Sequence, residues 1–308
     1  MSSYQRVLLQ TDFDRFARLT GDDNPIHCDP DFAAKSHFGA TVAHGMMLYS
    51  CICKALTEQI GPGVVQTEQT LMFPTLTYVG DRIHVELQVD GESDGLLDIA
   101  TDVTRVMRSA IQADGADSLC APGIPLRGQV TAIATVTGRC RVVAPGAPLP
   151  SVAPVAYPVE SGDSELYGLR RGMSASATRT FGAVDLDEYG DLTGDRNPIF
   201  RDDAEASARG FKRRIVPWPL LAGMFSDVLG TRLPGRGTGW MKQQLRYLSA
   251  AHPGEALTAT VTITRLRADK ELVNLATRVS AADGRVVCDG EALVLVRNLE
   301  NKTGPKLA

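Results

Sequence analysis

Asp22 and His27 stand five positions apart near the start of the chain, on either side of Asn24-Pro25. A carboxylate and a neutral imidazole are side chains that proteins commonly use to move protons near neutral pH. Because proline restricts the residue before it to extended geometry, Asn24-Pro25 predicts a turn instead of a regular helix. Such a turn allows Asp22 and His27 to converge on one water molecule, which predicts acid–base chemistry on water.

The stretch from Leu19 to His27 returns 173 positions later, with phenylalanine in place of the histidine. The copy keeps the aspartate, as Asp195, and the Asn-Pro pair, but it ends in Phe200. Sustained self-similarity over a long period indicates a duplicated structural unit. We therefore expect two related halves, of which only the first retains the chemistry.

An apolar stretch that begins at His44-Gly45-Met46 has helical spacing up to Ile60, where Gly61-Pro62-Gly63 stops it. It is apolar nearly all round, which indicates a buried helix. Gly45 would offer an amide N–H, the positive end of a helix dipole and close approach without a Cβ atom, which suits a developing oxyanion. The second half has Pro217-Trp218 at this place, and proline has no N–H to offer.

The elements that position these residues follow the same order in both halves. Asp29-Pro30 provides an N-cap and a tolerated proline for a short helix towards Phe38. Strands with alternating or apolar patterns are expected at 83–89, 96–104, 129–137, 257–263, 272–280 and 286–296. One apolar helix followed by three or more antiparallel strands predicts an α+β fold in each half, with a sheet wrapped on a central helix.

A proline-rich stretch separates the two halves. Its prolines are Pro145, Pro148, Pro150, Pro154 and Pro158, and this composition predicts an extended linker. We therefore divide the chain into a catalytic unit at 1–142, a linker at 143–174 and a degenerate, non-catalytic unit at 175–308. An irregular stretch at 107–127 has no counterpart in the second half and is interpreted as an inserted loop.

The composition limits the remaining classes of function. Apolar residues make up 44% of the 308 residues and charged residues 22%, as in globular proteins, and the net charge of -4 argues against a nucleic-acid partner. No stretch approaches the length of a membrane span, and the first residues, Met-Ser-Ser-Tyr-Gln-Arg, lack the apolar run of a signal peptide. We therefore expect no membrane association and a cytoplasmic location. The six cysteines are scattered without zinc spacing, so neither a metal nor another cofactor is expected.

The sequence Gly-Asp-x-Asn-Pro-x-His, followed by Phe32-Ala33 and His44-Gly45-Met46, resembles the MaoC-like (R)-specific enoyl-CoA hydratase family of the hotdog fold. The resemblance is close over about residues 12–91, and the duplication extends it to a double hotdog. It implies that Asp22 and His27 are the catalytic pair, and that the Gly45 N–H binds the thioester carbonyl. Asn24, His44 and Met46 are the candidates for substrate binding.

The resemblance implies a cofactor-free hydro-lyase that reversibly hydrates a trans-2-enoyl thioester to an (R)-3-hydroxyacyl thioester. The substrate would be carried on CoA or acyl carrier protein, in fatty acid or polyketide metabolism. A double hotdog would act as a monomeric pseudo-dimer or as a homodimer. The acyl length, the physiological direction and the member of the Asp22/His27 pair that protonates the α-carbon stay open.

Other interpretations compete with this one. Asn24 survives in both halves, so a structural role in the turn competes with substrate binding, and Met46 is also typical of a core residue. Hotdog folds also host thioesterases, and fold alone does not define function. A non-catalytic acyl-binding or partner subunit is a third alternative, against which the intact set of Asp22, His27 and Gly45 counts.

Overall fold

The computed structural model describes residues 4–106, 132–162 and 164–300, and the predicted insertion at 107–127 lies outside these ranges. The first half contains β1 (Tyr4–Val7), α1 (Gln10–Thr20), α2 (Pro25–Cys28), α3 (Pro30–Lys35), α4 (Gly45–Gln59), β2 (Val65–Met72), β3 (Arg82–Ser93), β4 (Leu96–Val106) and β5 (Ala132–Val143). The predicted helices and strands of this half are therefore present, although residues 129–131 of one predicted strand lie outside the described ranges. Elements β1, α1, α2 and β2 occur in addition.

The second half repeats the order of elements. It contains the short pair β6 (Glu165–Leu166) and β7 (Leu169–Arg170), then β8 (Ser174–Thr180), α6 (Ala183–Thr193), α7 (Pro198–Arg201), α8 (Asp203–Ala208), α9 (Trp218–Thr231), β9 (Gly239–Tyr247), β10 (Ala256–Arg267), η2 (Ala268–Lys270), β11 (Leu272–Ala281) and β12 (Val286–Leu295). The apolar helices α4 and α9 begin 173 residues apart, which is the offset of the sequence repeat.

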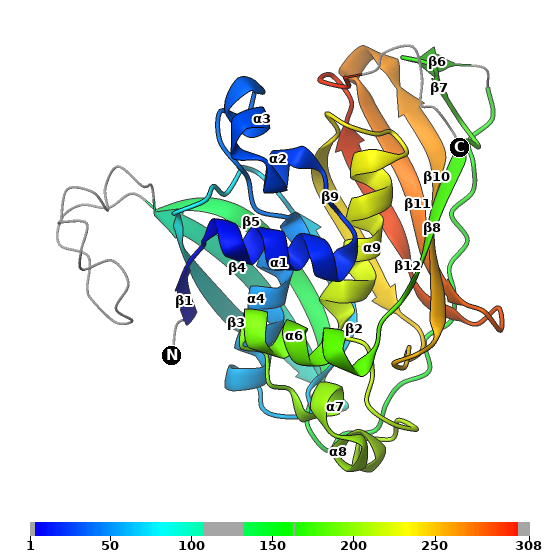
Figure 1. Ribbon diagram of the computed structural model, residues 1–308. Helices are drawn as coiled ribbons and strands as arrows, with labels where there is room; N and C mark the ends of the chain where they lie inside the picture. The colour runs from blue at the N-terminus through cyan, green and yellow to red at the C-terminus, as the bar shows by residue number, and fades with distance from the viewer. Residues whose placement is uncertain (1–3, 107–131, 163, 301–308) are drawn as a thin grey trace, which may run out of the picture.

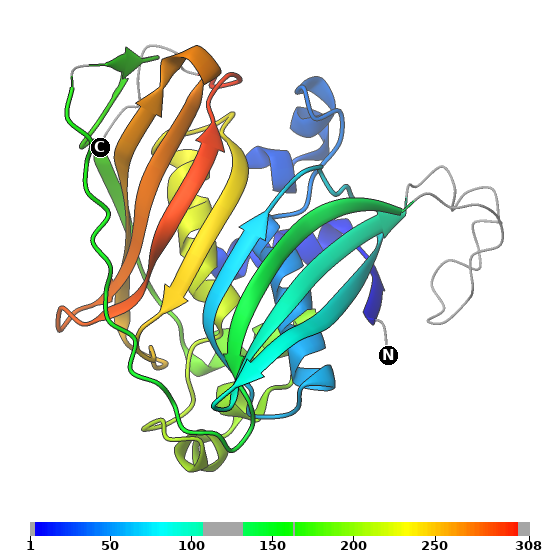
Figure 2. The same ribbon diagram turned by 180° about the vertical axis from the view of Figure 1, so that it is seen from behind.

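The two halves share one ten-stranded antiparallel sheet, with strand order β1-β3-β4-β5-β2-β9-β12-β11-β10-β8. Strands β2 and β9 pair along the middle, with Gln69 opposite Leu245, and they join the halves into a continuous sheet (Figure 1). The sheet curves around the helices, as the view from behind shows (Figure 2). The α+β prediction is confirmed, and the two units meet side by side through their edge strands.

Helices α4 and α9 cover the concave face of the sheet and contact each other across the junction (Figure 1). Both are buried over most of their length, because apolar side chains occur on nearly every side of them. Helices α1 and α6 lie over this pair and contact each other. The core is therefore a single cluster that includes residues of both halves.

The proline-rich stretch between β5 and β6 runs along the face of the sheet opposite the helices (Figure 2). The backbone N–H of Val155 donates a hydrogen bond of 3.0 Å to Oδ2 of Asp289, and the Arg246 guanidinium donates to the Ala153 carbonyl. The linker is thus fastened to β9 and β12 of the second half. The division into units at 1–142 and 175–308 stays a prediction, since the sheet and the core run through both halves.

Candidate active site

The turn between α1 and α3 is built by glycine, asparagine and proline. Gly21 ends α1 in the left-handed region, with φ of 84°, where glycine carries no Cβ penalty. The Asn24 side chain then accepts a hydrogen bond from the Ile26 N–H, and Pro25 occupies the first position of the short helix α2. The predicted turn therefore occupies the residues up to Asn24, and His27 lies in the one-turn helix that follows it.

The side chains of Asp22 and His27 converge inside the protein. His27 Nε2 lies 3.8 Å from Asp22 Oδ2, and the two residues are 8% and 1% exposed. His27 Nδ1 lies 2.7 Å from the Val42 carbonyl oxygen, which can only accept, so Nδ1 carries the hydrogen. In the neutral imidazole, Nε2 therefore presents its lone pair towards the carboxylate. The gap between the two groups suits a water molecule that contacts both.

His44 lies directly behind His27. The two imidazole rings stack with centroids 3.8 Å apart, and His44 Nε2 donates a hydrogen bond of 3.0 Å to the Asp22 backbone carbonyl. Burial, together with the neighbouring His27, lowers the pKa of His44 to about 3. His44 is therefore neutral near pH 7, and it ties the Asp22 turn to the start of α4.

Gly45 is the first residue of α4, and it lines the same cavity as Asp22 and His27. Among the described residues, none accepts a hydrogen bond from this N–H, as is usual for the first turn of a helix. A Cβ atom at position 45 would come within 2.9 Å of the Phe73 ring. The glycine thus leaves a donor without a protein acceptor, and it allows the Phe73 ring to approach the start of α4.

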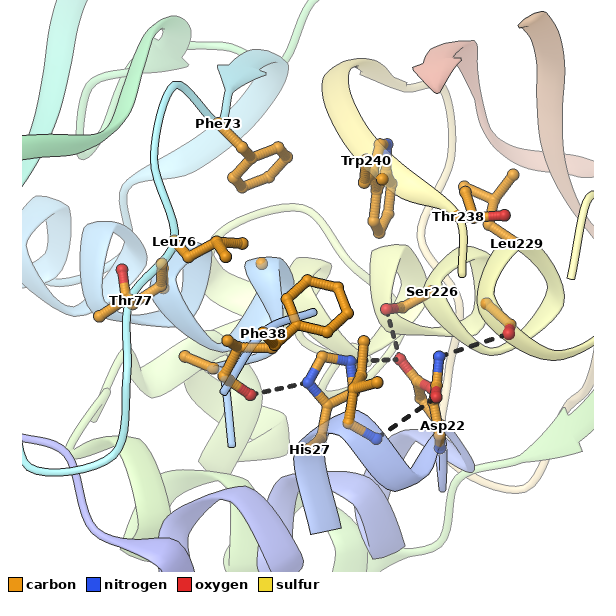
Figure 3. Close-up of a pocket in the computed structure, with 18 of the residues that line it drawn as sticks. Asp22, His27, Phe38, Phe73, Leu76, Thr77, Ser226, Leu229, Thr238 and Trp240 are labelled. Atoms are coloured by element: carbon orange, nitrogen blue, oxygen red, sulfur yellow. Dashed lines mark hydrogen bonds and ion pairs between the residues drawn. The ribbon is translucent and has the colours of Figure 1, made fainter. Parts of the chain in front are cut away.

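A cavity of about 110 Å³ opens beside the dyad and the Gly45 amide. Its first-half wall includes Phe38, Phe73 and Leu76, and its second-half wall includes Leu229 and Trp240 (Figure 3). Most of the lining is apolar, and the ionisable groups of the lining are Asp22 and His27. The cavity therefore combines an apolar pocket with a corner that contains a carboxylate and an imidazole, and both halves of the chain build it.

The structure brings together four of the six residues singled out in the sequence. Asp22, His27, Gly45 and Asn24 line the cavity. Asn24 also fastens the turn, since its Nδ2 is 3.4 Å from the Gly230 carbonyl oxygen. The other two, His44 and Met46, are fully buried and are not among the lining residues. His44 contacts the dyad instead of the cavity, and Met46 belongs to the core.

The sequence analysis did not single out the second-half residues of the site. Ser226 of α9 lines the cavity and donates a hydrogen bond of 2.5 Å to Asp22 Oδ2 (Figure 3). Leu229 and Trp240 come from the same half. The sequence analysis predicted neither strand β9, which carries Trp240, nor the crossing of α9 to the first-half turn.

The corresponding place in the second half is filled by aromatic side chains. Phe200 stands where His27 stands in the first half, and its ring packs edge to face on Trp218, with centroids 5.0 Å apart. Both side chains are buried. Pro217, at the position of His44, has no N–H and begins α9 as its N-cap. This half-site therefore has neither an imidazole nor the space beside one.

Asp22, His27 and His44 are close enough to be considered as metal ligands, since one ligand atom from each lies within 4.8 Å of the others. However, His44 Nε2 carries a hydrogen that it donates to the Asp22 carbonyl, so this nitrogen has no lone pair for a metal. Only two ligands would then remain, fewer than the three protein ligands of a catalytic zinc site. The donor set therefore does not fit a metal ion.

No helix in the described ranges is both long enough and apolar enough to cross a membrane.

Comparisons with known structures define the class of fold. An MaoC-like dehydratase aligns over 95% of this chain and 97% of its own, with 17% identity and a TM-score of 0.70. A conserved hypothetical protein of Mycobacterium tuberculosis with a double hotdog fold aligns over 96% of this chain and 95% of its own, with 14% identity and a TM-score of 0.62. The fold is therefore a double hotdog.

Sequence comparisons then identify the family. The profile of the MaoC like domain matches residues 2–109, and that of the FAS1-like dehydratase domain region matches residues 172–290. The (R)-specific enoyl-CoA hydratase of Aeromonas caviae is 37% identical over 126 residues, which are 41% of this chain and 94% of that protein. The enzyme of the same description from Rhodospirillum rubrum is 39% identical over 128 residues, or 42% and 88% of the two chains. The chain belongs to the MaoC-like hydratase and dehydratase family.

Proposed function

We propose that the protein is a hydro-lyase that reversibly adds water to a trans-2-enoyl thioester and forms an (R)-3-hydroxyacyl thioester. The observation that carries the proposal is the convergence of Asp22, His27 and the Gly45 N–H on one largely apolar cavity. The names of the relatives support it, because they include (R)-specific enoyl-CoA hydratases and a 3-hydroxybutyryl-CoA dehydratase of Methylorubrum extorquens.

In the hydration direction, a water molecule held between His27 Nε2 and Asp22 Oδ2 gives one proton to the pair. Its oxygen forms a bond to the β-carbon, and the electron pair of the double bond moves towards the thioester to give an enolate. A proton from the pair then forms the bond to the α-carbon, so that the pair ends with the protons with which it began. His27 and Asp22 thus perform general acid–base catalysis.

The negative charge of the enolate gathers on the thioester oxygen. The free N–H of Gly45, at the positive end of α4, is the donor that would stabilise this oxygen. Loss of one such donor typically costs about 3–4 kcal/mol of transition-state stabilisation. The apolar walls from Phe73, Leu76 and Trp240 would hold the acyl chain and keep other water molecules away.

The thioester carrier would be CoA or acyl carrier protein. Relatives named for each carrier occur. The Aeromonas caviae enzyme is named for CoA, and a mitochondrial protein of Arabidopsis thaliana with 29% identity is named a 3-hydroxyacyl-[acyl-carrier-protein] dehydratase. We propose that one chain carries one complete site and acts as a pseudo-dimer of its own halves, because both halves line the cavity. The cytoplasmic location stays a prediction.

Replacement of His27 by alanine or of Asp22 by asparagine tests the proposal. With crotonyl-CoA as substrate, we expect the rate of hydration to fall by about 10²- to 10⁴-fold in either variant, because a positioned acid or base is lost. The matched control is Asp195→Asn, which changes the equivalent carboxylate of the second half and should retain hydration. Full activity in His27→Ala would overturn the proposal. Release of free CoA thiol, without formation of a hydroxyacyl product, would indicate a thioesterase instead.

A further inference from the structure

A contact between the two halves fixes the carboxylate of the proposed dyad. Ser226 lies on α9 of the second half, and its hydroxyl donates a hydrogen bond of 2.5 Å to Asp22 Oδ2. Both residues are buried, with exposures of 5% and 1%. Since they are 204 positions apart in the sequence, only the packing of α9 against the Asp22 turn brings them together.

The oxygen that Ser226 holds is the oxygen that faces His27. Asp22 Oδ2 lies 3.8 Å from His27 Nε2, whereas Oδ1 faces the backbone N–H of Asn24 at 3.4 Å (Figure 3). Ser226 also lines the cavity, so its hydroxyl is beside the water position that the dyad defines. Its hydrogen bond therefore sets the direction in which Oδ2 can accept from that water.

The second half-site provides an internal comparison. Asp195 stands at the position of Asp22, but its Oδ2 accepts from the Tyr189 hydroxyl at 3.1 Å and its Oδ1 accepts from Thr57 at 2.8 Å. At the offset of 173, the first half-site has Phe16 in place of Tyr189 and Gly230 in place of Thr57. Neither of these replacements offers a side-chain hydroxyl.

The serine itself also differs between the two helices. At the same offset, the residue of α4 that corresponds to Ser226 is Cys53, whose thiol donates to Gln66 at 3.6 Å. Ser226 therefore supplies the hydroxyl that faces Asp22. The hydroxyls that face Asp195 come from Tyr189 and Thr57, which are not at the position equivalent to Ser226. The oxygen facing the imidazole is held by one donor, and the other oxygen has no side-chain hydroxyl against it in the described part of the chain.

We propose that Ser226 is a positioning residue for the hydration reaction, and that the second half contributes it to hold Asp22 Oδ2 opposite His27 Nε2. The proposal rests on the proposed function. It assigns the second half a direct part in the chemistry, in addition to its part in the walls of the cavity. Ser226 acts through Asp22, and no covalent step involves its hydroxyl.

The test compares Ser226→Ala with Ser226→Thr in the full-length chain, by steady-state hydration of crotonyl-CoA. In the alanine variant we expect kcat to fall by about 10- to 100-fold with KM changed by less than about threefold, because misplacement of a catalytic group by about 1 Å costs this much in rate. In the threonine variant, which retains a hydroxyl, we expect kcat to recover to within about fivefold of the wild type.

Thr57→Val is the matched control, because it removes the equivalent kind of hydrogen bond from Asp195 in the half-site that lacks the imidazole. It should lower the midpoint of thermal unfolding and leave kcat near the wild-type value. Equal losses of kcat in Ser226→Ala and Ser226→Thr, or an unchanged kcat in Ser226→Ala, would overturn the proposal. If the wild-type chain itself fails to hydrate any enoyl thioester, the proposed function fails instead, and the two failures are distinguishable.

Discussion

Thr57 of α4 donates a hydrogen bond to Asp195, which belongs to the other half of the chain. The corresponding contact from α9 to Asp22 is made by Ser226, which lies one helical turn before Gly230, the residue of α9 that is equivalent to Thr57. Each aspartate is therefore held by the central helix of the opposite half. The two half-sites differ in more than the exchange of histidine for phenylalanine, and the following predictions depend on these differences.

Restoring the missing histidine should not restore a second active site. In the double variant His27→Ala/Phe200→His, we expect hydration to stay at the level of His27→Ala. The reason is that Pro217 and the Trp218 ring leave no equivalent of His44 and Gly45, and both oxygens of Asp195 already accept from side-chain hydroxyls. Steady-state hydration of crotonyl-CoA by both variants makes the comparison. Recovery above about a tenth of wild-type activity would contradict this account.

The Gly45 amide can be removed without breaking the helix. Proline is tolerated at the first position of a helix, and the φ of -60° and ψ of 133° at His44 suit the residue before a proline. We expect Gly45→Pro to lower kcat by about 10²-fold more than Gly45→Ala, because only the proline variant loses the donor. Both variants bring a Cβ atom against Phe73, so the alanine variant controls for that contact. Equal kcat values in the two variants would remove the oxyanion role of this N–H.

Gly230 keeps space beside Asp22. A Cβ atom there would lie 3.1 Å from Asn24 Nδ2 and 3.8 Å from Asp22 Oδ1. Alanine favours a helix by about 1 kcal/mol over glycine, so Gly230→Ala should keep or raise the thermal stability. We nevertheless expect kcat to fall several-fold, because Asn24 must move and the Asp22 turn moves with it. Thermal unfolding and hydration kinetics on the same preparation check both statements. A drop in stability with normal kcat would be the opposite result.

Asp195 should make the stability depend on pH. Burial raises the pKa of this carboxyl to about 6, although hydrogen bonds from Thr57, Asn197 and Tyr189 act in the opposite direction. Because the pKa of Asp195 is higher in the folded state, this carboxyl stabilises the folded protein at pH values below its unfolded-state pKa, near 3.8. The contribution is lost as the pH rises through the folded-state pKa of about 6. A difference of about two pKa units corresponds to about 3 kcal/mol.

Urea unfolding of the wild type and of Asp195→Asn at pH 4 and pH 7 measures this contribution. Between the two pH values, the free energy of unfolding of the wild type should fall relative to that of the variant by about 2 kcal/mol, which is less than the full amount because the unfolded-state carboxyl is already partly ionised at pH 4. The comparison between variants cancels the titration of other groups. If both proteins change in parallel, Asp195 does not carry this pH dependence.

The sequence allowed prediction of the elements with strong periodicity. The apolar helix from Met46 to Ile60 corresponds to α4, and the alternating stretch at 83–89 lies within β3. Strands β2 and β9 were missed, although they form the junction of the halves. Their inward positions include glutamines, since Gln69 and Gln243 are buried. Each donates to the carbonyl of the next residue in its own strand, and they also donate to Thr101 and Thr277, respectively. A buried polar side chain interrupts the alternation by which a strand is recognised.

The turn with Asp22 and His27 was predictable because proline, asparagine and glycine define it locally. Ser226 was not, because nothing in the sequence of α9 shows which turn the helix will contact. Its counterpart Cys53 faces another environment, so the repeat alone gave no signal. The local geometry of the dyad thus followed from the sequence, whereas the contribution of the second half required the packing of the two helices.

Each central helix contacts the aspartate of the other half, and this arrangement has a consequence for substitutions in either helix. If two copies of the first half were paired with each other, Cys53 would stand in the place of Ser226, and the Thr57 side chain would project towards Asp22 where Gly230 now leaves room. Mutations in α9 therefore act on the reacting carboxylate even though they fall in the half that has lost its histidine.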